Sequence, residues 1–266
     1  MKKFRTVTYE IHSPKICSRD GVRFALLADL HGLEFGKEGR CLLEEIRKSH
    51  PKAVLAAGDM IVRKKKESLD VAQKLLLGLA RDYPVYYALG NHECKMNAEG
   101  NELRGDYLDY EKRLSAGGIR FLHNQRASFE VGPDRFSVYG LELPMEYYHK
   151  PTSPKLTAAA VRKLIGSPKP EEVNILLAHN PKYGNAYFSW AADLTVSGHY
   201  HGGIVRFNRH TGLTCPQFLL FPPYCCGDFR QGNRHMVVSA GLGEHTIPVR
   251  IHNPRELVII DMKPGP

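Results

Sequence analysis

Short apolar runs alternate with segments of helical periodicity through the first half of the chain. The runs have the length of buried strands and cover residues 22–28, 53–57, 85–89 and 119–122. Between them, apolar residues spaced three and four apart predict helices at residues 39–48, 69–81 and 106–116. Strands that alternate with helices favour a mostly parallel sheet.

Strands predominate in the second half. Gly132, Pro133 and Asp134 separate two strand candidates, residues 127–131 and 135–141, which is typical of a hairpin. A helix is predicted at residues 156–165. Further strands are predicted at residues 173–178, 194–197, 203–207, 235–239, 249–251 and 256–261, and loops at 143–154 and 211–231. We therefore predict one α/β domain over residues 1–266, with its core at about 22–261. Two mixed β-sheets should pack face to face with helices outside, as a four-layer αββα sandwich.

Composition is that of an ordinary globular protein, with 42% hydrophobic and 24% charged residues. No stretch approaches the ~20 apolar residues that a membrane span needs. The basic start of the chain is not followed by the apolar segment of a signal peptide, so we expect a cytoplasmic protein. Lys and Arg number 37 against 28 Asp and Glu, which leaves a net charge of +9. That balance suits an anionic partner such as a phosphate ester, a nucleic acid or an acidic lipid surface, and also fits a protein that is merely basic.

Five short groups of metal-ligand residues each follow a predicted strand. They supply carboxylates, imidazoles and one amide, from Asp29 and His31, Asp59, Asn91 and His92, His179, and His199 and His201. Strand ends at one edge of a sheet can bring residues distant in sequence to one point. Each group alone is a weak signal, but together they form a complete ligand set for two divalent metals acting on phosphate.

In this order, the five groups resemble the calcineurin-like metallophosphoesterase superfamily, whose pattern is D-x-H, G-D, G-N-H-[DE], H and G-H-x-H. The resemblance extends over about residues 22–261 and implies a dinuclear metal centre at strand ends between the two sheets. It implies a first metal bound by Asp29, His31 and His201. A second would be bound by Asn91, His179 and His199, with Asp59 bridging both. The two ions would be Mn²⁺, Fe or Zn²⁺.

The same resemblance implies roles in catalysis. A hydroxide that bridges the metals would attack phosphorus in line, with His92 protonating the leaving oxygen as general acid. Asn91, His92 and Arg250 are the candidate substrate contacts. For Glu93 we weighed an acid that orients a ligand against a plain acid at a helix start, and we expect the second.

The C-terminal third, with its segments 198–203 and 241–257, is similar to bacterial phosphodiesterases, some of which cleave the pyrophosphate of UDP-2,3-diacylglucosamine. We therefore predict a metal-dependent phosphohydrolase, specifically a phosphodiesterase, acting on a phosphoester such as a nucleotide-linked or lipid phosphodiester. The alternatives are a nuclease acting on DNA or RNA, and a non-catalytic binding protein on a phosphoesterase scaffold. We expect no stable nucleic-acid partner. Peripheral contact with an anionic membrane surface is a further option, and the oligomeric state is left open.

Overall fold

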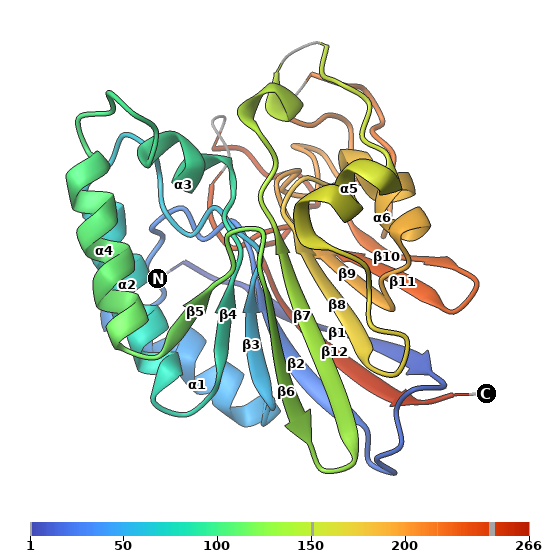
Figure 1. Ribbon diagram of the computed structural model, residues 1–266. Helices are drawn as coiled ribbons and strands as arrows, with labels where there is room; N and C mark the ends of the chain where they lie inside the picture. Colours follow the sequence, from blue (N-terminus) through green and yellow to red (C-terminus); the bar gives the residue numbers. More distant parts are fainter. Residues whose placement is uncertain (1, 150–151, 217, 245–247, 266) are drawn as a thin grey trace.

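The computed structural model describes residues 2–149, 152–216, 218–244 and 248–265, and two six-stranded β-sheets form its centre (Figure 1). In the first sheet the strands lie in the order β1 (Arg5–Ser13), β12 (Glu256–Pro264), β2 (Val22–Leu27), β3 (Ala53–Ala56), β4 (Val85–Tyr87) and β5 (Ile119–Phe121). Strands β2 to β5 are parallel to one another, whereas β12 runs antiparallel to β2 and parallel to β1.

The second sheet also has four parallel strands, but an antiparallel strand flanks them at each edge. Its order is β10 (Gly227–Gln231), β11 (Arg234–Val238), β9 (Leu194–Ser197), β8 (Val173–Ala178), β7 (Asp134–Leu141) and β6 (Arg126–Val131). Strands β11, β9, β8 and β7 are parallel. The predicted hairpin is confirmed, because β6 and β7 pair antiparallel.

Helices cover the outer face of each sheet (Figure 1). The first sheet carries α1 (Arg40–Ser49), α2 (Glu67–Ala80) and α4 (Arg104–Ala116), and the second carries α5 (Ala158–Ile165) and α6 (Gly184–Trp190). The short α3 (Asn91–Met96) begins at the end of β4. All four helices expected from periodicity form, within a few residues of their predicted bounds.

Three buried apolar clusters fill the spaces between the layers. Along β2, Ala25 and Leu27 pack toward the helices, whereas Phe24 and Leu26 pack between the sheets. This alternation follows from the two-residue period of a strand, and because both faces are covered the run reads as continuously apolar. A third cluster around Trp190 joins the second sheet to α5 and α6. The predicted four-layer αββα fold with two mixed sheets is confirmed.

Two predicted strands were wrong. Residues 203–207 and 249–251 are loops that meet through one isolated bridge between Val205 and Ile251. Their apolar side chains misled the prediction, because Phe207, Val249 and Ile251 are exposed and do not belong to a sheet face. The predicted loop at 211–231 was wrong at its end, where β10 pairs with β11.

Strand β1 and helices α3 and α6 were not predicted. In β1, Tyr9 and Ile11 are buried while Thr8, Glu10 and His12 are exposed, which is the alternation of an edge strand with one face covered. Helices α3 and α6 are six and seven residues long, too short for a helical stripe to be recognised. No helix in the part of the chain that the structure describes is long and apolar enough to cross a membrane.

A buried ion pair ties the loop that follows β9 to the start of β12. Arg206 Nη1 donates to Glu256 Oε1 at 2.5 Å, and the side chains of these two residues are 5% and 0% exposed. Arg5 Nη2 donates to the same oxygen at 2.6 Å from a half-exposed position. Since Glu256 has almost no access to water, its charge depends on these two guanidinium groups.

We predict that Arg206→Met lowers the free energy of unfolding by about 3 kcal/mol, because it leaves the buried carboxylate of Glu256 with one partner. The matched control is Arg47→Met, which breaks the exposed pair with Asp82 and should cost less than about 1 kcal/mol. Urea denaturation of the two variants measures the difference. Equal losses would contradict a structural role for the Arg206 pair.

Candidate metal centre

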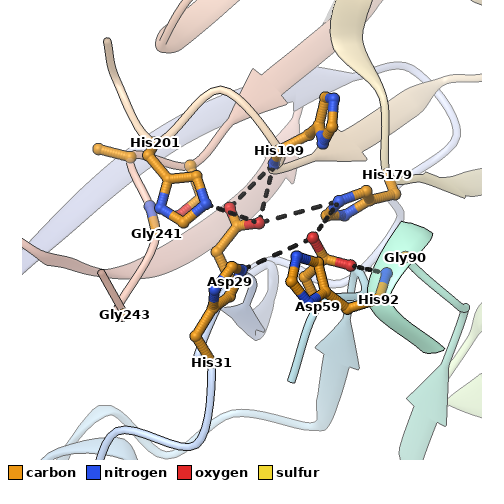
Figure 2. A network of polar contacts seen from close by, with 12 residues as sticks. Asp29, His31, Asp59, Gly90, His92, His179, His199, His201, Gly241 and Gly243 are labelled. Atoms are coloured by element: carbon orange, nitrogen blue, oxygen red, sulfur yellow. Dashed lines mark hydrogen bonds and ion pairs between the residues drawn. The ribbon is translucent and has the colours of Figure 1, made fainter. Parts of the chain in front are cut away.

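The carboxyl ends of parallel strands from both sheets meet at one edge, and every predicted ligand lies there. Asp29 and His31 follow β2, Asp59 follows β3, and Asn91 follows β4. From the second sheet, His179 follows β8, and His199 and His201 follow β9. Figure 2 shows the imidazole and carboxylate side chains of these groups turned toward one another.

Potential ligand atoms gather in three overlapping groups, each with its atoms within 4.8 Å of one another. The groups are Asp29, His31 and His201; His31, Asp59 and His92; and Asp59, His179 and His199. Asp59 and His31 each belong to two of them, and of these two only Asp59 is a carboxylate, the kind of group that two ions can share. All of these residues are buried except His31 and His92, which are partly buried.

The two ligand carboxylates are held by backbone N–H groups of other ligand segments. Both oxygens of Asp29 accept from His199 N–H, at 3.0 and 2.9 Å, and Asp59 Oδ1 accepts from His92 N–H at 2.8 Å. Burial raises the pKa of Asp29 to about 6, against the opposing charge of His179. Burial also favours a higher pKa for Asp59. The charges of His179 and His92 outweigh burial and lower the pKa of Asp59 well below its ordinary value.

His179 is oriented by its second ring nitrogen. Its Nδ1 lies 2.7 Å from the Ala57 carbonyl, so this nitrogen carries a proton and donates it. Nε2 then points at the carboxylates, 3.1 Å from Asp59 Oδ2. Burial by itself would lower the pKa of His179, but Asp59 and Asp29 raise it to about 9. The two carboxylates therefore favour positive charge at Nε2 of His179. A metal ion bound to this nitrogen would take the place of its proton.

Two further polar atoms fit a metal. Asn91 Oδ1 and His31 Nε2 are buried, and within the described residues neither has a hydrogen-bond partner. Buried polar atoms are rarely left in this state unless something else satisfies them. An amide oxygen, imidazole nitrogens and carboxylate oxygens are together a donor set suited to Mn²⁺, Fe or Zn²⁺. The residues present therefore fit divalent metal ions.

The backbone at the ligands is strained. Asp29, His31, Asp59, His199 and His201 all have φ between 50° and 68°, in the left-handed region that non-glycine residues rarely adopt. Such conformations persist only where the surroundings impose them, and they cluster at functional sites. The turns after β2, β3 and β9 thus direct the candidate ligand side chains toward one another. The strained backbone lowers the local stability of these turns.

Two glycines leave room for the ligand carboxylates. A Cβ at Gly90 would lie 2.2 Å from Asp59 Oδ1, and a Cβ at Gly198 would lie 2.5 Å from Asp29 Oδ2. Any side chain at either position would displace a carboxylate. Gly90 of the Gly-Asn-His segment is therefore required because a side chain there would collide with Asp59, and not because of its φ angle.

Comparison with known proteins assigns the chain to a family. Residues 22–203 match the calcineurin-like phosphoesterase family, which is more than half of the chain. The chain belongs to this family. The predicted resemblance is confirmed at that level.

Several individual proteins are similar to this phosphoesterase. An uncharacterized metallophosphoesterase of Aquifex aeolicus is 22% identical over 97% of this chain and 92% of its own length. Phosphodiesterase YaeI of Escherichia coli is 25% identical over 73% of this chain and 64% of its own. The Caenorhabditis elegans protein F40B5.2 is 25% identical over 91% of this chain, which spans about half (48%) of that longer protein. The structure of sulfate thiohydrolase SoxB from Thermus thermophilus shares the fold, with a TM-score of 0.52 and 13% identity over 85% of this chain and 53% of SoxB.

Glu93 does more than the sequence predicted. It lies at the start of α3 as expected and accepts from the Gly90 N–H there (3.0 Å). It is also fully buried and accepts hydrogen bonds from the N–H groups of Asp59 (2.9 Å) and Met60 (2.7 Å) and from the Tyr87 hydroxyl (2.7 Å). Burial and the charge of Asp59 raise the pKa of Glu93 to about 7, while these donors act in the opposite direction. Glu93 thus fixes the turn that carries Asp59.

His92 lies at the edge of the cleft, with its ring centroid 4.7 Å from that of His31. Its Nδ1 accepts from the N–H of Arg63 at 3.1 Å, so a neutral ring carries its proton on Nε2. Burial lowers the pKa of His92 to about 4, against the charge of Asp59.

Arg250 and Asn253 hold loops beside the site. The Arg250 guanidinium donates to the carbonyls of Ala240 (2.9 Å) and Gly243 (2.7 Å), and burial lowers its pKa to about 10. Asn253 Nδ2 donates to the His201 carbonyl at 2.7 Å. Tyr148, from the predicted loop at 143–154, packs edge-on against His199 at 5.4 Å between ring centroids. The sequence carried no signal for Asn253, because its partner is distant along the chain.

We predict that Glu93→Gln weakens Mn²⁺ binding by about 10- to 100-fold, since an amide places N–H donors against the N–H groups that now point at a carboxylate. Tyr87→Phe is the matched control, because it removes one donor and leaves the Glu93 carboxylate in place. Calorimetric titration with Mn²⁺ measures both affinities. A Glu93→Gln protein with unchanged affinity would show that Glu93 does not position the ligands.

Proposed function

We propose that this protein is a metal-dependent phosphodiesterase in which His92 protonates the leaving oxygen. The observation that carries the proposal is the placement of His92, which lies at the ligand cluster while its Nδ1 is already engaged by Arg63. The bond from Arg63 orients the ring so that Nε2, and not Nδ1, is available to a substrate. A general acid at this place acts in the imidazolium form, from which Nε2 gives up its proton and leaves a neutral ring.

The residues that would hold the metals are those of the ligand cluster. Asp29, His31 and His201 would hold one ion, and Asn91, His179 and His199 another, with Asp59 shared. Divalent ions held there would supply Lewis-acid stabilisation of phosphoryl oxygens and a water of lowered pKa. The carboxylates of Asp29 and Asp59 would offset the charge of the ions, and the neutral ligands would add no further charge.

The chain's own groups account for the proton transfer. In its imidazolium form, His92 donates the Nε2 proton to the ester oxygen as the bond from that oxygen to phosphorus breaks. The ring is left neutral, and release of an unprotonated alkoxide is avoided. In the neutral ring, the Arg63 N–H fixes the ring plane. The negative charge of a bound phosphate favours a proton on His92, which opposes the effect of burial on its pKa.

A groove that begins at Arg63, next to His92, supports a diester rather than a monoester. Arg63, Lys64 and Lys66 line this groove of about 690 Å³ together with Glu67 and residues 100–103, which include Glu102. Arg63 connects the groove to the general acid through its backbone. A second ester group, such as a nucleotide-linked or lipid moiety, has room there, and Arg63 and Lys64 offer positive charge to it. The name of the similar Escherichia coli protein, a phosphodiesterase, supports the same choice.

We predict that the Mn²⁺-loaded protein hydrolyses bis-p-nitrophenyl phosphate with a kcat/KM at least about ten-fold above that for p-nitrophenyl phosphate. Parallel assays with Mn²⁺, Fe²⁺ and Zn²⁺ measure the preference for each metal. Faster hydrolysis of the monoester would contradict the diesterase proposal. Faster turnover of single-stranded DNA or RNA than of either small ester would favour the nuclease, and metal binding without any hydrolysis would favour a binding protein.

We further predict that His92→Ala lowers kcat by about 100- to 10,000-fold, the range for loss of a general acid, while metal content is unchanged. Asp59→Asn is the control with the opposite pattern, because loss of the shared carboxylate should deplete bound metal. Elemental analysis and turnover are measured on the same preparations. Loss of metal from His92→Ala would reassign this histidine as a ligand.

A further inference from the structure

Exposed apolar side chains are concentrated at one place on the molecule. Of the seven large hydrophobic residues that are exposed among the described residues, six lie in the loop after β9 and the segment before β12. These six, here called the apolar rim, are Phe207, Phe218, Leu220, Phe221, Val249 and Ile251. Phe218 and Leu220 are 75% and 70% exposed. Single exposed apolar residues are normal, but a cluster on one surface indicates an interaction site.

The two segments form one surface. Val205 bridges to Ile251, and the Arg206 N–H donates to the Ile251 carbonyl at 3.0 Å. Phe207 and Phe221 approach to 5.9 Å between ring centroids, which brings both parts of the longer loop together. The rim therefore combines residues that are far apart in the sequence.

Basic side chains surround the rim. The sequence contains no Asp or Glu between Asp193 and Asp228, a span that includes Phe207 to Phe221. Beside Phe207, a groove of about 910 Å³ is lined by Arg5, Arg209 and His252 among others. A neighbouring groove of about 530 Å³ adds Lys3 and Arg255. The nearby carboxylates are fewer than the basic groups and are already engaged by them, Glu256 by Arg5 and Arg206, Asp228 by Arg209, and Glu244 by Lys2 and Arg255.

We propose that the apolar rim and its basic surround dock this protein onto the surface of an anionic lipid bilayer. Phe and Leu side chains on loops can enter the boundary between headgroups and acyl chains, while Arg and Lys remain at the level of the phosphates. The absence of acidic residues from the loop and the net charge of +9 complement a negative surface. A protein partner would need carboxylates on its surface to complement the basic side chains around the rim. A second copy of this chain carries the same net positive charge and does not complement them.

The rim is structurally continuous with the candidate metal centre. The longer loop begins directly after His201, and Asn253 in the shorter segment donates to the His201 carbonyl. Docking would therefore place the cleft close to the bilayer, within reach of a phosphoester at its surface. The docking itself does not depend on the proposed activity, because it is measured by binding alone.

Co-sedimentation with phosphatidylcholine vesicles, with and without phosphatidylglycerol, tests the proposal. We expect the protein to bind the phosphatidylglycerol vesicles, and raised salt to weaken this binding. Phe218→Ser combined with Leu220→Ser should weaken it by at least about ten-fold, because two largely exposed apolar side chains no longer enter the bilayer. Arg209→Gln should weaken it by about five-fold, the equivalent of one basic residue near an anionic surface.

Leu108→Ser is the matched control, since Leu108 is 44% exposed on α4, outside the rim, and its loss should leave vesicle binding unchanged. Circular dichroism confirms that each variant is folded. Equal binding by the wild type and the double variant would overturn the proposal, as would absence of binding to the anionic vesicles. Self-association in sedimentation velocity that the double variant abolishes, without vesicle binding, would assign the rim to contact between copies of the chain.

Discussion

The structure depends on keeping three carboxylates out of water at the edge where the two sheets meet. Asp29, Asp59 and Glu93 are all buried, and each accepts backbone N–H groups from another segment of the site. His199 donates to Asp29, His92 to Asp59, and Asp59 in turn to Glu93. These bonds join the ends of β2, β3, β4 and β9 into one unit. Because an unpaired buried charge is costly, the unit needs positive charge in the cleft, which histidinium or metal ions can provide.

The ligand chemistry is divided between the sheets. The first sheet contributes both candidate carboxylates, the amide of Asn91 and His31, whereas the second contributes only imidazoles, from His179, His199 and His201. Neither sheet alone carries the full set of candidate ligands. The apolar cluster between the sheets, with Phe24 against Phe136 at 5.3 Å between centroids, therefore sets the relative position of the two ligand sets. Packing between the sheets, away from the candidate ligands, therefore sets the distances between the ligands of one sheet and those of the other.

Much of this was predictable, for a physical reason. A strand buried on both faces is a continuous apolar run, so the polar residues that end it stand out, and parallel strands bring those ends to one edge. The candidate ligands from Asp29 to His201 were predicted in this way. The role of Glu93 was only partly predicted, because most of its donors come from the separate segments around Asp59 and Tyr87, and no local pattern shows that an acid is buried. The false strands at 203–207 and 249–251 arose because exposed apolar residues have the same pattern as buried ones.

The position of β12 has a consequence for how the molecule is made. This last strand inserts between β1 and β2, the two strands nearest the N-terminus in sequence. Until residues 256–264 leave the ribosome, the edges of β1 and β2 have no partner, so the first sheet cannot close during synthesis. Pairings of such long sequence separation form slowly. The emerging chain thus exposes an incomplete first sheet until β12 has been made, which makes closure of this sheet a late step in the folding of the two-sheet core.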